Sequence, residues 1–283
     1  MSESKQLVWV ITGTSSGIGR SLTLAALKRG DRVIATARKS SVAQLADLKA
    51  QGADVLELDV TDSFENIKAI AQKAVAIHGR VDVVVNNAGY AIIGAIEEHT
   101  PEESLQQFNT NLFGALNVAR AFLPYLRERK TGTIIFIGSI TAWSPSPSFG
   151  LYAATKYAIR GVSEALNGEI APFGLRSINV ELGYFKTEVL KKRIAYVNRV
   201  PDYKEAISQV DAFLEAYVDQ PGDPAKAADV IVDVVRGEGA AGALPFQPTI
   251  GLGSDIHADA VKNIETTTKR LAEWEAVARS TDF

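Results

Sequence analysis

The sequence of 283 residues contains no cysteine, which excludes disulfide bonds and any chemistry that needs a thiolate. Histidine is also scarce. His78, His99 and His257 lie far apart along the chain and lack the spacing of metal ligands. We therefore expect no metal site.

A basic block and a long apolar run are missing as well. The 30 Lys and Arg residues are interspersed with 33 Asp and Glu residues, for a net charge of −3. A nucleic-acid-binding surface needs clustered Lys and Arg, so this balance argues against one. Without an apolar run of about 18 residues we expect no membrane span. The first residues, MSESKQLVWVITG, lack the features of a secretory signal, and we expect a cytoplasmic protein.

What the chain does have is an alternation of short apolar runs and longer helix-like segments. The runs are rich in Val and Ile and nearly continuous, which is typical of parallel strands buried on both faces. They are LVWVI (7–11), RVIATA (32–37), DVLEL (54–58), DVVVN (82–86), TIIFIG (133–138), RSINVEL (176–182) and PTIGLG (248–253). Segments with helical spacing lie between them, at about 17–29, 41–50, 64–78, 102–128 and 152–171. This pattern predicts an α/β fold, a single Rossmann-type doubly wound parallel sheet of about seven strands with helices on both faces.

No linker or repeat divides the chain, so we expect a single domain over residues 1–283. Residues 184–222 interrupt the alternation and are predicted to form a flap over the substrate. Residues 255–283 predict a final amphipathic helix that carries Ile264, Leu271, Trp274 and Ala278 on one side. That side would pack on the chain's own sheet or on a second subunit.

The first strand leads directly into a glycine-rich turn, TGTSSGIGRS. Gly13, Gly17 and Gly19 stand where a strand must turn into a helix, in the order G-x-x-x-G-x-G, a variant of the dinucleotide fingerprint. Free backbone amides and the helix dipole favour a pyrophosphate there, next to Ser15, Ser16 and Ile18. The alternative is a tight turn without a ligand.

The end of the second strand indicates which nucleotide binds. A carboxylate at this position would bond the ribose hydroxyl of NAD, but the chain has Ala37, Arg38 and Lys39. Arg38 can clamp a phosphate, which favours NADP (NADPH) over NAD. The alternative is that Arg38 and Lys39 are simply solvated.

Short polar segments follow the third and fourth strands. Asp59 can accept from the adenine amino group, with the Val60 N–H nearby. Asn86 and Asn87 can tie neighbouring strands together, and Ala88 and Gly89 leave room for a ribose. Ligands of open α/β sheets collect at these carboxyl ends of strands.

The stretch LYAATKYAIR places Tyr152 and Lys156 one helical turn apart on one face. Taken alone, this pair is typical of an amphipathic helix whose Tyr packs and whose Lys reaches water. The wider pattern changes that interpretation.

In order and spacing, the chain from about residue 6 to 190 resembles the short-chain dehydrogenase/reductase family. The resemblance is carried by TGTSSGIG (12–19), NNAG (86–89), NLFG (111–114), Ser139 in IGS, and YAATK (152–156). Further segments, such as GYAIIGAIEE and ALNGEIAPFG, are similar to the branch of carbonyl and hydroxysteroid reductases.

The resemblance implies that Tyr152 donates and accepts the proton, with Lys156 beside it. An ordinary phenol has a pKa near 10, so its anion needs the Lys156 ammonium and an oxidised nicotinamide nearby. Lys156 would also hold the nicotinamide ribose. Ser139 would polarise the substrate carbonyl, and Asn111 would hold a water that relays protons through Lys156.

The chain departs from the family after the sixth strand, where Leu182 replaces the usual proline before Gly183. Proline would fix φ in a turn that faces the nicotinamide, so we expect this turn to keep its shape with more freedom. Gly183 remains for close approach to the cofactor, and Thr187 remains to bond the carboxamide.

The substrate is less well defined by the sequence. Trp143, Tyr90, Phe149, Tyr184 and Phe185 predict an apolar pocket for a bulky carbonyl compound, although each ring can instead pack under the flap. We expect NADPH-dependent reduction of a ketone or aldehyde, with a small-molecule substrate. Oxidation of a secondary alcohol, and a non-catalytic NADPH sensor or scaffold, stay open. A homodimer or homotetramer is implied by the family alone.

Overall fold

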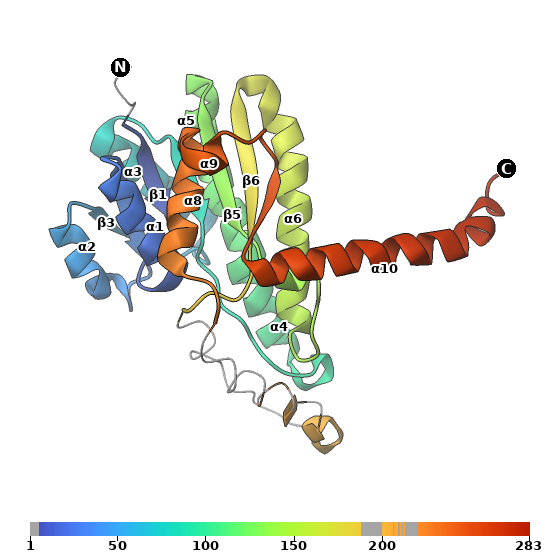
Figure 1. Ribbon diagram of the computed structural model, residues 1–283. Helices are drawn as coiled ribbons and strands as arrows, with labels where there is room; N and C mark the ends of the chain where they lie inside the picture. Colours follow the sequence, from blue (N-terminus) through green and yellow to red (C-terminus); the bar gives the residue numbers. More distant parts are fainter. Residues whose placement is uncertain (1–5, 188–199, 206, 209, 211, 213–219) are drawn as a thin grey trace.

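The computed structural model describes residues 6–187, 200–205, 207–208, 210, 212 and 220–283 (Figure 1). Its centre is a seven-stranded sheet in the order β3-β2-β1-β4-β5-β6-β7, and every neighbouring pair is parallel. The strands are β1 Val8–Ile11, β2 Arg32–Ala37, β3 Asp54–Glu57, β4 Val83–Asn86, β5 Gly132–Ile137, β6 Leu175–Leu182 and β7 Thr249–Leu252. The predicted fold class and all seven predicted strands are confirmed.

Helices cover both faces of the sheet (Figure 1). They are α1 Gly17–Lys28, α2 Ala46–Ala50, α3 Phe64–His78, α4 Pro101–Phe108, α5 Ala115–Arg129, α6 Gly150–Ile170, α8 Pro224–Arg236, α9 Gly239–Gly242 and α10 Ser254–Arg279. Alternate residues of β1 enter different cores: Val8 and Val10 pack with α3, α5 and α6, whereas Trp9 and Ile11 pack with α1 and α8. Burial on both faces explains why the strands are nearly continuous apolar runs.

The side on which successive strands are added to the sheet changes between β1 and β4. The strands β1, β2 and β3 build outward on one side, and β4 to β7 build outward on the other. At such a switch point, the carboxyl ends of the two central strands leave a crevice between their diverging connections. The polar segments predicted to bind the cofactor follow these strands.

The segment predicted as one helix at 102–128 is divided in three. α4 begins at a Thr100 capping box with Glu103, and a π-helical turn, Asn109–Gly114, separates it from α5. Gly114 lies so close to the segment after β3 that a Cβ there would stand 2.7 Å from the Val60 carbonyl oxygen. The extra residue of the π turn buries Asn111, which is 3% exposed.

The predicted C-terminal helix forms, but it leaves the body (Figure 1). Ile256 at its base is buried, whereas every residue from Thr268 onward is exposed, with Leu271 at 66% and Trp274 at 62%. The chain's own sheet is therefore not what covers the apolar side of α10. None of the described helices is long and apolar enough to cross a membrane.

Most of the predicted flap, 184–222, lies outside the described residues. Its two ends are tied together where Phe185 forms a parallel bridge with Gly222. Near the middle, the Val200 N–H donates to Glu98 Oε1 at 2.9 Å, and the Tyr203 hydroxyl donates to Glu97 Oε2 at 2.7 Å.

Candidate active site

A cavity of about 620 Å³ opens at the carboxyl ends of the strands. Except for Gly19 and Asn111, every residue predicted to take part in catalysis or to bind the cofactor lines it, including Ser139, Tyr152 and Lys156. The lining residues predicted for the cofactor are Gly13, Ser15, Ser16, Gly17, Ile18, Arg38, Asp59, Val60, Asn87, Ala88, Gly89, Gly183 and Thr187. Segments from both halves of the chain thus meet in one space.

The glycine-rich turn after β1 presents the start of α1 to this cavity. Gly13 and Gly17 have φ of 70° and 58°, in the left-handed region that glycine adopts without strain. Gly19 lies behind the lining, where a Cβ would stand 2.4 Å from Asn87 Nδ2. The three glycines therefore shape a turn whose helix N-terminus favours an anion.

Asn87 fixes this turn to the end of β4. Its Nδ2 donates to the Thr12 and Gly13 carbonyls at 2.8 and 3.0 Å. The Thr12 hydroxyl in return accepts from the Asn87 and Ala88 N–H groups, both at 3.0 Å. Asn86 Nδ2 donates to the Ile135 carbonyl of β5 at 3.3 Å. Both asparagines tie neighbouring strands together, as the sequence predicted.

The end of β2 forms the opposite part of the lining. Ala37 and Arg38 line the cavity together with Ser41 and Gln44, which the sequence reasoning missed. Asp59 is held in place because its Oδ1 accepts from the Thr61 N–H at 2.9 Å and from the Thr61 hydroxyl at 2.7 Å. The cation at Arg38 and the absence of a carboxylate directly after β2 suit a nucleotide that carries an additional phosphate.

Helix α6 brings Tyr152 and Lys156 to the cavity. Lys156 Nζ lies 5.5 Å from the centroid of the Tyr152 ring and donates to the Ile137 carbonyl at 2.6 Å. Burial lowers the pKa of the Lys156 ammonium to about 8. Burial also raises the pKa of the Tyr152 phenol, and hydrogen bonding with Ser139 acts in the opposite direction. Lys156 is thus buried and Tyr152 partly buried at the cavity wall, where a second positive charge would affect the phenol.

Ser139 follows β5 and begins the short helix η4, Ile140–Ala142. Its Oγ accepts from the Thr141 N–H at 3.2 Å, which orients the hydroxyl within the lining. Tyr152 and Ser139 thus reach the same part of the cavity from two different elements.

Asn111 lies behind this part of the cavity. Its Oδ1 accepts from the Tyr90 N–H at 3.1 Å, and its Nδ2 donates to the Tyr90 carbonyl at 2.9 Å and to Thr155 Oγ1 at 3.2 Å. The Thr155 hydroxyl donates to the Tyr152 carbonyl at 2.7 Å. The Asn111 side chain thus joins the segment after β4 to the turn of α6 that carries Tyr152. Thr155 was not singled out from the sequence.

Four of the five predicted aromatic residues line the cavity: Tyr90, Phe149, Tyr184 and Phe185. The prediction for Trp143 is wrong, because its ring lies outside the lining. Its indole N–H donates to Glu181 Oε2 at 2.5 Å, and the Arg160 guanidinium lies 3.9 Å from the ring centroid.

Glu181, which the sequence reasoning missed, is fully buried in β6. Burial raises the pKa of its carboxyl, and the charge of Arg160 opposes that rise. Asn179 Nδ2 also donates to it, at 3.0 Å. A carboxylate inside the apolar run INVEL was the available sequence signal, because a buried acid requires partners.

Among the described residues, no group of three or more His, Asp or Glu side chains could hold a metal ion. The fit of a dinucleotide rests instead on the positive-φ glycines at the start of α1 and on the long cavity that runs from there to Tyr152.

Comparisons with known proteins agree with this geometry. A family model described as short chain dehydrogenase matches residues 7–197. The chain is 39% identical to a 3-ketodihydrosphingosine reductase of Bacteroides thetaiotaomicron, over 63% of this chain and 64% of that protein. A solved short-chain dehydrogenase from Streptomyces avermitilis is 38% identical, covers 100% of both chains and superposes with a TM-score of 0.88. A solved serine dehydrogenase in complex with NADP+ is 25% identical, covers 87% of this chain and 94% of its own, and gives a TM-score of 0.72.

Proposed function

The chain belongs to the short-chain dehydrogenase/reductase family of oxidoreductases, and from this premise we propose that it reduces a bulky apolar ketone or aldehyde with NADPH. One observation carries the proposal. Ser139, Tyr152 and Lys156 line the same cavity as the glycine-rich turn and Arg38. A proton donor, a carbonyl-polarising hydroxyl and a dinucleotide cradle thus share one space.

When bound, the reduced nicotinamide supplies a hydride to the carbonyl carbon, and the chain supplies the rest. The Ser139 hydroxyl donates a hydrogen bond to the substrate oxygen as negative charge develops there. The Tyr152 hydroxyl gives that oxygen its proton, so the product is the neutral alcohol. The Lys156 ammonium stabilises the phenolate that remains on Tyr152. Oxidation of an alcohol would use the same groups in reverse.

The burial of Lys156 supports these roles. An ammonium acts more strongly on a nearby phenolate where water is excluded, because the effective dielectric is lower there. Lys156 is 8% exposed, and its bonded partner is the neutral Ile137 carbonyl. Its charge is therefore not offset by a carboxylate at that contact.

The preference for NADPH rests on Arg38. Its place in the lining, directly after Ala37, suits a ribose phosphate. Ser15 and Ser16 across the turn can add hydroxyl donors. The NADP+ complex of the serine dehydrogenase relative is consistent with this preference.

The four aromatic rings of the lining favour a bulky apolar substrate. The similarity to a 3-ketodihydrosphingosine reductase also favours reduction of a ketone. A homodimer or homotetramer and a cytoplasmic location are part of this proposal. A non-catalytic NADPH sensor is the second candidate, and the cavity geometry alone would suit it equally.

The test is to mix the protein with NADPH and a panel of apolar ketones and aldehydes and to follow the loss of NADPH absorbance. We expect turnover with at least one of them, and a strong preference over NADH. Tight NADPH binding without turnover on any carbonyl compound would support the sensor. Absence of NADPH binding would refute both proposals.

A further inference from the structure

The turn after β6 forms part of the cavity wall, and α10 contacts it from behind. Gly183 and Tyr184 line the cavity immediately after Leu182. Asp255, the second residue of α10, accepts a hydrogen bond from the Tyr184 N–H through Oδ2 at 2.6 Å. Its other oxygen, Oδ1, accepts from the Ile256 N–H at 2.8 Å. The carboxylate therefore joins the wall to the start of the helix.

Gly183 packs directly on this carboxylate. A Cβ at position 183 would stand only 1.9 Å from Asp255 Oδ1 and 2.5 Å from its Cγ. The Gly183 N–H also donates to the Leu252 carbonyl of β7 at 2.9 Å. The turn is thus bonded to β7 on one side and lies against Asp255 on another, and only glycine fits between them.

The base of α10 is itself well anchored. Ile256 is 1% exposed, and Asn263 Nδ2 donates to the Trp143 carbonyl at 2.7 Å. Trp143 directly follows η4, the short helix that Ser139 begins. The first turns of α10 therefore contact the two segments that carry the Ser139 side and the Gly183 side of the cavity. Because the start of α10 is anchored in this way, the Asp255 carboxylate can hold the Tyr184 N–H in a fixed position.

We propose that Asp255 is a positioning residue for the nicotinamide end of the cofactor. Its carboxylate holds the Gly183–Tyr184 backbone against the cavity and gives the turn the stiffness that a proline at position 182 would otherwise supply. Proline would fix φ before Gly183 through its ring, whereas Leu182 has no such ring, so Asp255 adds a restraint from the helix. This inference rests on the proposed function, because it assumes that a nicotinamide occupies this end of the cavity.

The first experiment measures NADPH affinity by fluorescence titration, and kcat at saturating NADPH with a substrate from the ketone panel. Asp255→Ala removes the acceptor of the Tyr184 N–H, and we expect the Kd for NADPH to rise about tenfold. We expect kcat at saturating NADPH to fall far less. Asp255→Asn keeps an oxygen that can accept this bond but loses the charge, and it should raise the Kd for NADPH by only about threefold. The matched control, Asp259→Ala, lies one turn further along α10 and should equal the parent.

The decisive variant is the double substitution Leu182→Pro with Asp255→Ala. If Asp255 acts by stiffening the turn, proline at 182 returns the Kd toward that of the parent. If Asp255 only stabilises the fold, Asp255→Ala should lower the Tm, and adding Leu182→Pro should not restore the Kd for NADPH. An unchanged Kd in Asp255→Ala, or a raised Kd that proline leaves as it is, would overturn the inference.

If Asp255→Ala does not fold, Asp255→Asn with and without Leu182→Pro decides. A modest rise in Kd that proline reverses supports the inference, and no change in either variant refutes it. If the parent itself neither binds NADPH nor turns over, the proposed function fails. If the parent does both and the Asp255 variants match it, only the role of Asp255 fails.

Discussion

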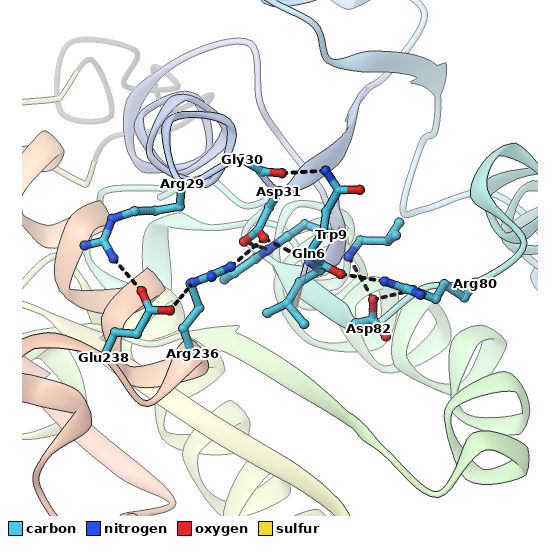
Figure 2. Close-up of polar contacts among 11 residues, drawn as sticks. Gln6, Trp9, Arg29, Gly30, Asp31, Arg80, Asp82, Arg236 and Glu238 are labelled. Carbon is cyan, nitrogen blue, oxygen red and sulfur yellow. Dashed lines mark hydrogen bonds and ion pairs between the residues drawn. The ribbon is translucent and has the colours of Figure 1, made fainter. Parts of the chain in front are cut away.

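Two groups of charged residues at opposite edges of the sheet have different kinds of partner. At the amino ends of the strands, charged side chains are paired with one another (Figure 2). The Asp31 carboxylate accepts from the Leu7 N–H and the Trp9 indole, both at 2.9 Å, and lies 2.6 Å from Arg236. Glu238 bridges Arg236 and Arg29 at 2.9 Å each. At the carboxyl ends, Lys156 is also buried, at 8% exposed, but it donates to a neutral carbonyl.

We infer that this difference separates charges that hold the fold together from a charge that acts in the proposed chemistry. The amino edge joins the N-terminal strand to α8 and to the segment between α3 and β4, and its charges neutralise each other within the protein. The carboxyl edge keeps a cation whose pKa burial has lowered, next to a phenol whose pKa burial has raised. Such perturbed groups in a cavity are typical of functional sites, because a bound ligand can complete their interactions.

The largest expected effect comes from removing the phenol hydroxyl at the carboxyl edge. Tyr152→Phe should lower kcat about a thousandfold, since the reduction then lacks its proton donor. NADPH affinity and Tm should stay near those of the parent. Tyr157→Phe, on the same helix but 44% exposed, is the matched control and should not change the rate. A Tyr152→Phe enzyme as fast as the parent would rule out the proposed chemistry.

Breaking the amino edge should act on stability instead of rate. Arg236→Met leaves the fully buried Asp31 without its cation, and we expect a loss of about 3 kcal/mol in the free energy of unfolding. The kcat per folded molecule should not change. Arg279→Met removes one partner of an exposed pair on α10 and should cost less than about 1 kcal/mol. Equal losses in a denaturant titration would contradict the distinction between the two kinds of charge.

The cofactor preference is expected to follow Arg38. Arg38→Asp should raise the Kd for NADPH about tenfold or more, because a charge-assisted bond to phosphate is lost and a repulsion is added. The Kd for NADH should change little. Lys39→Ala serves as the control, because Lys39 is the neighbour of Arg38 and does not line the cavity. An unchanged preference between the two cofactors would refute the assignment to NADPH.

A pH profile tests the buried cation directly. Below a pH of about 8, the Lys156 ammonium of the free enzyme is mostly charged, and above it the charge is lost. The kcat/KM for NADPH should therefore fall about tenfold per pH unit above that value. The unfolded chain holds this proton to a higher pH, so Lys156 also makes stability rise with pH above about 8. Lys156→Met should lack this rise in a denaturant titration, and a rise equal to that of the parent would contradict the assignment.

The smallest effect is expected from Leu182→Pro in the otherwise unchanged chain. The turn already contacts Asp255, so added stiffness should change the Kd for NADPH slightly and kcat less. Cofactor titration and saturation kinetics measure the two separately. An equally large loss of turnover at saturating cofactor would show that the turn must move during the reaction.

Most of the sheet could be predicted from the sequence because its five inner strands are buried on both faces, and a strand in that environment is a nearly continuous apolar run. Helix α8 follows clear local signals that the periodicity analysis did not use, an Asp223 N-cap and Pro224 in the first turn. The break at Asn109–Gly114 had no such signal. It arises where Gly114 packs on Val60, far away in the sequence.

The residues of the candidate site likewise fall into those with a local sequence signal and those placed by contacts between distant segments. Its glycines, Ser139 and the Tyr152–Lys156 pair stand in local motifs, and their roles stay predictions that the variants above can test. Trp143 was assigned to the wrong place because its partner, Glu181, lies on another strand. Asp255 and Tyr184 are 71 residues apart in the sequence, and no local signal at either residue predicts their contact.

Helix α10 also sets the size that this molecule shows in solution. Its 26 residues span about 39 Å, and the outer part stands clear of the body. A rounded chain of this length has a radius of gyration of about 19 Å. Small-angle scattering from single chains should accordingly exceed that radius and show a long tail of interatomic distances, and removal of residues 268–283 should shorten the tail while leaving Asp255 and Asn263 in place.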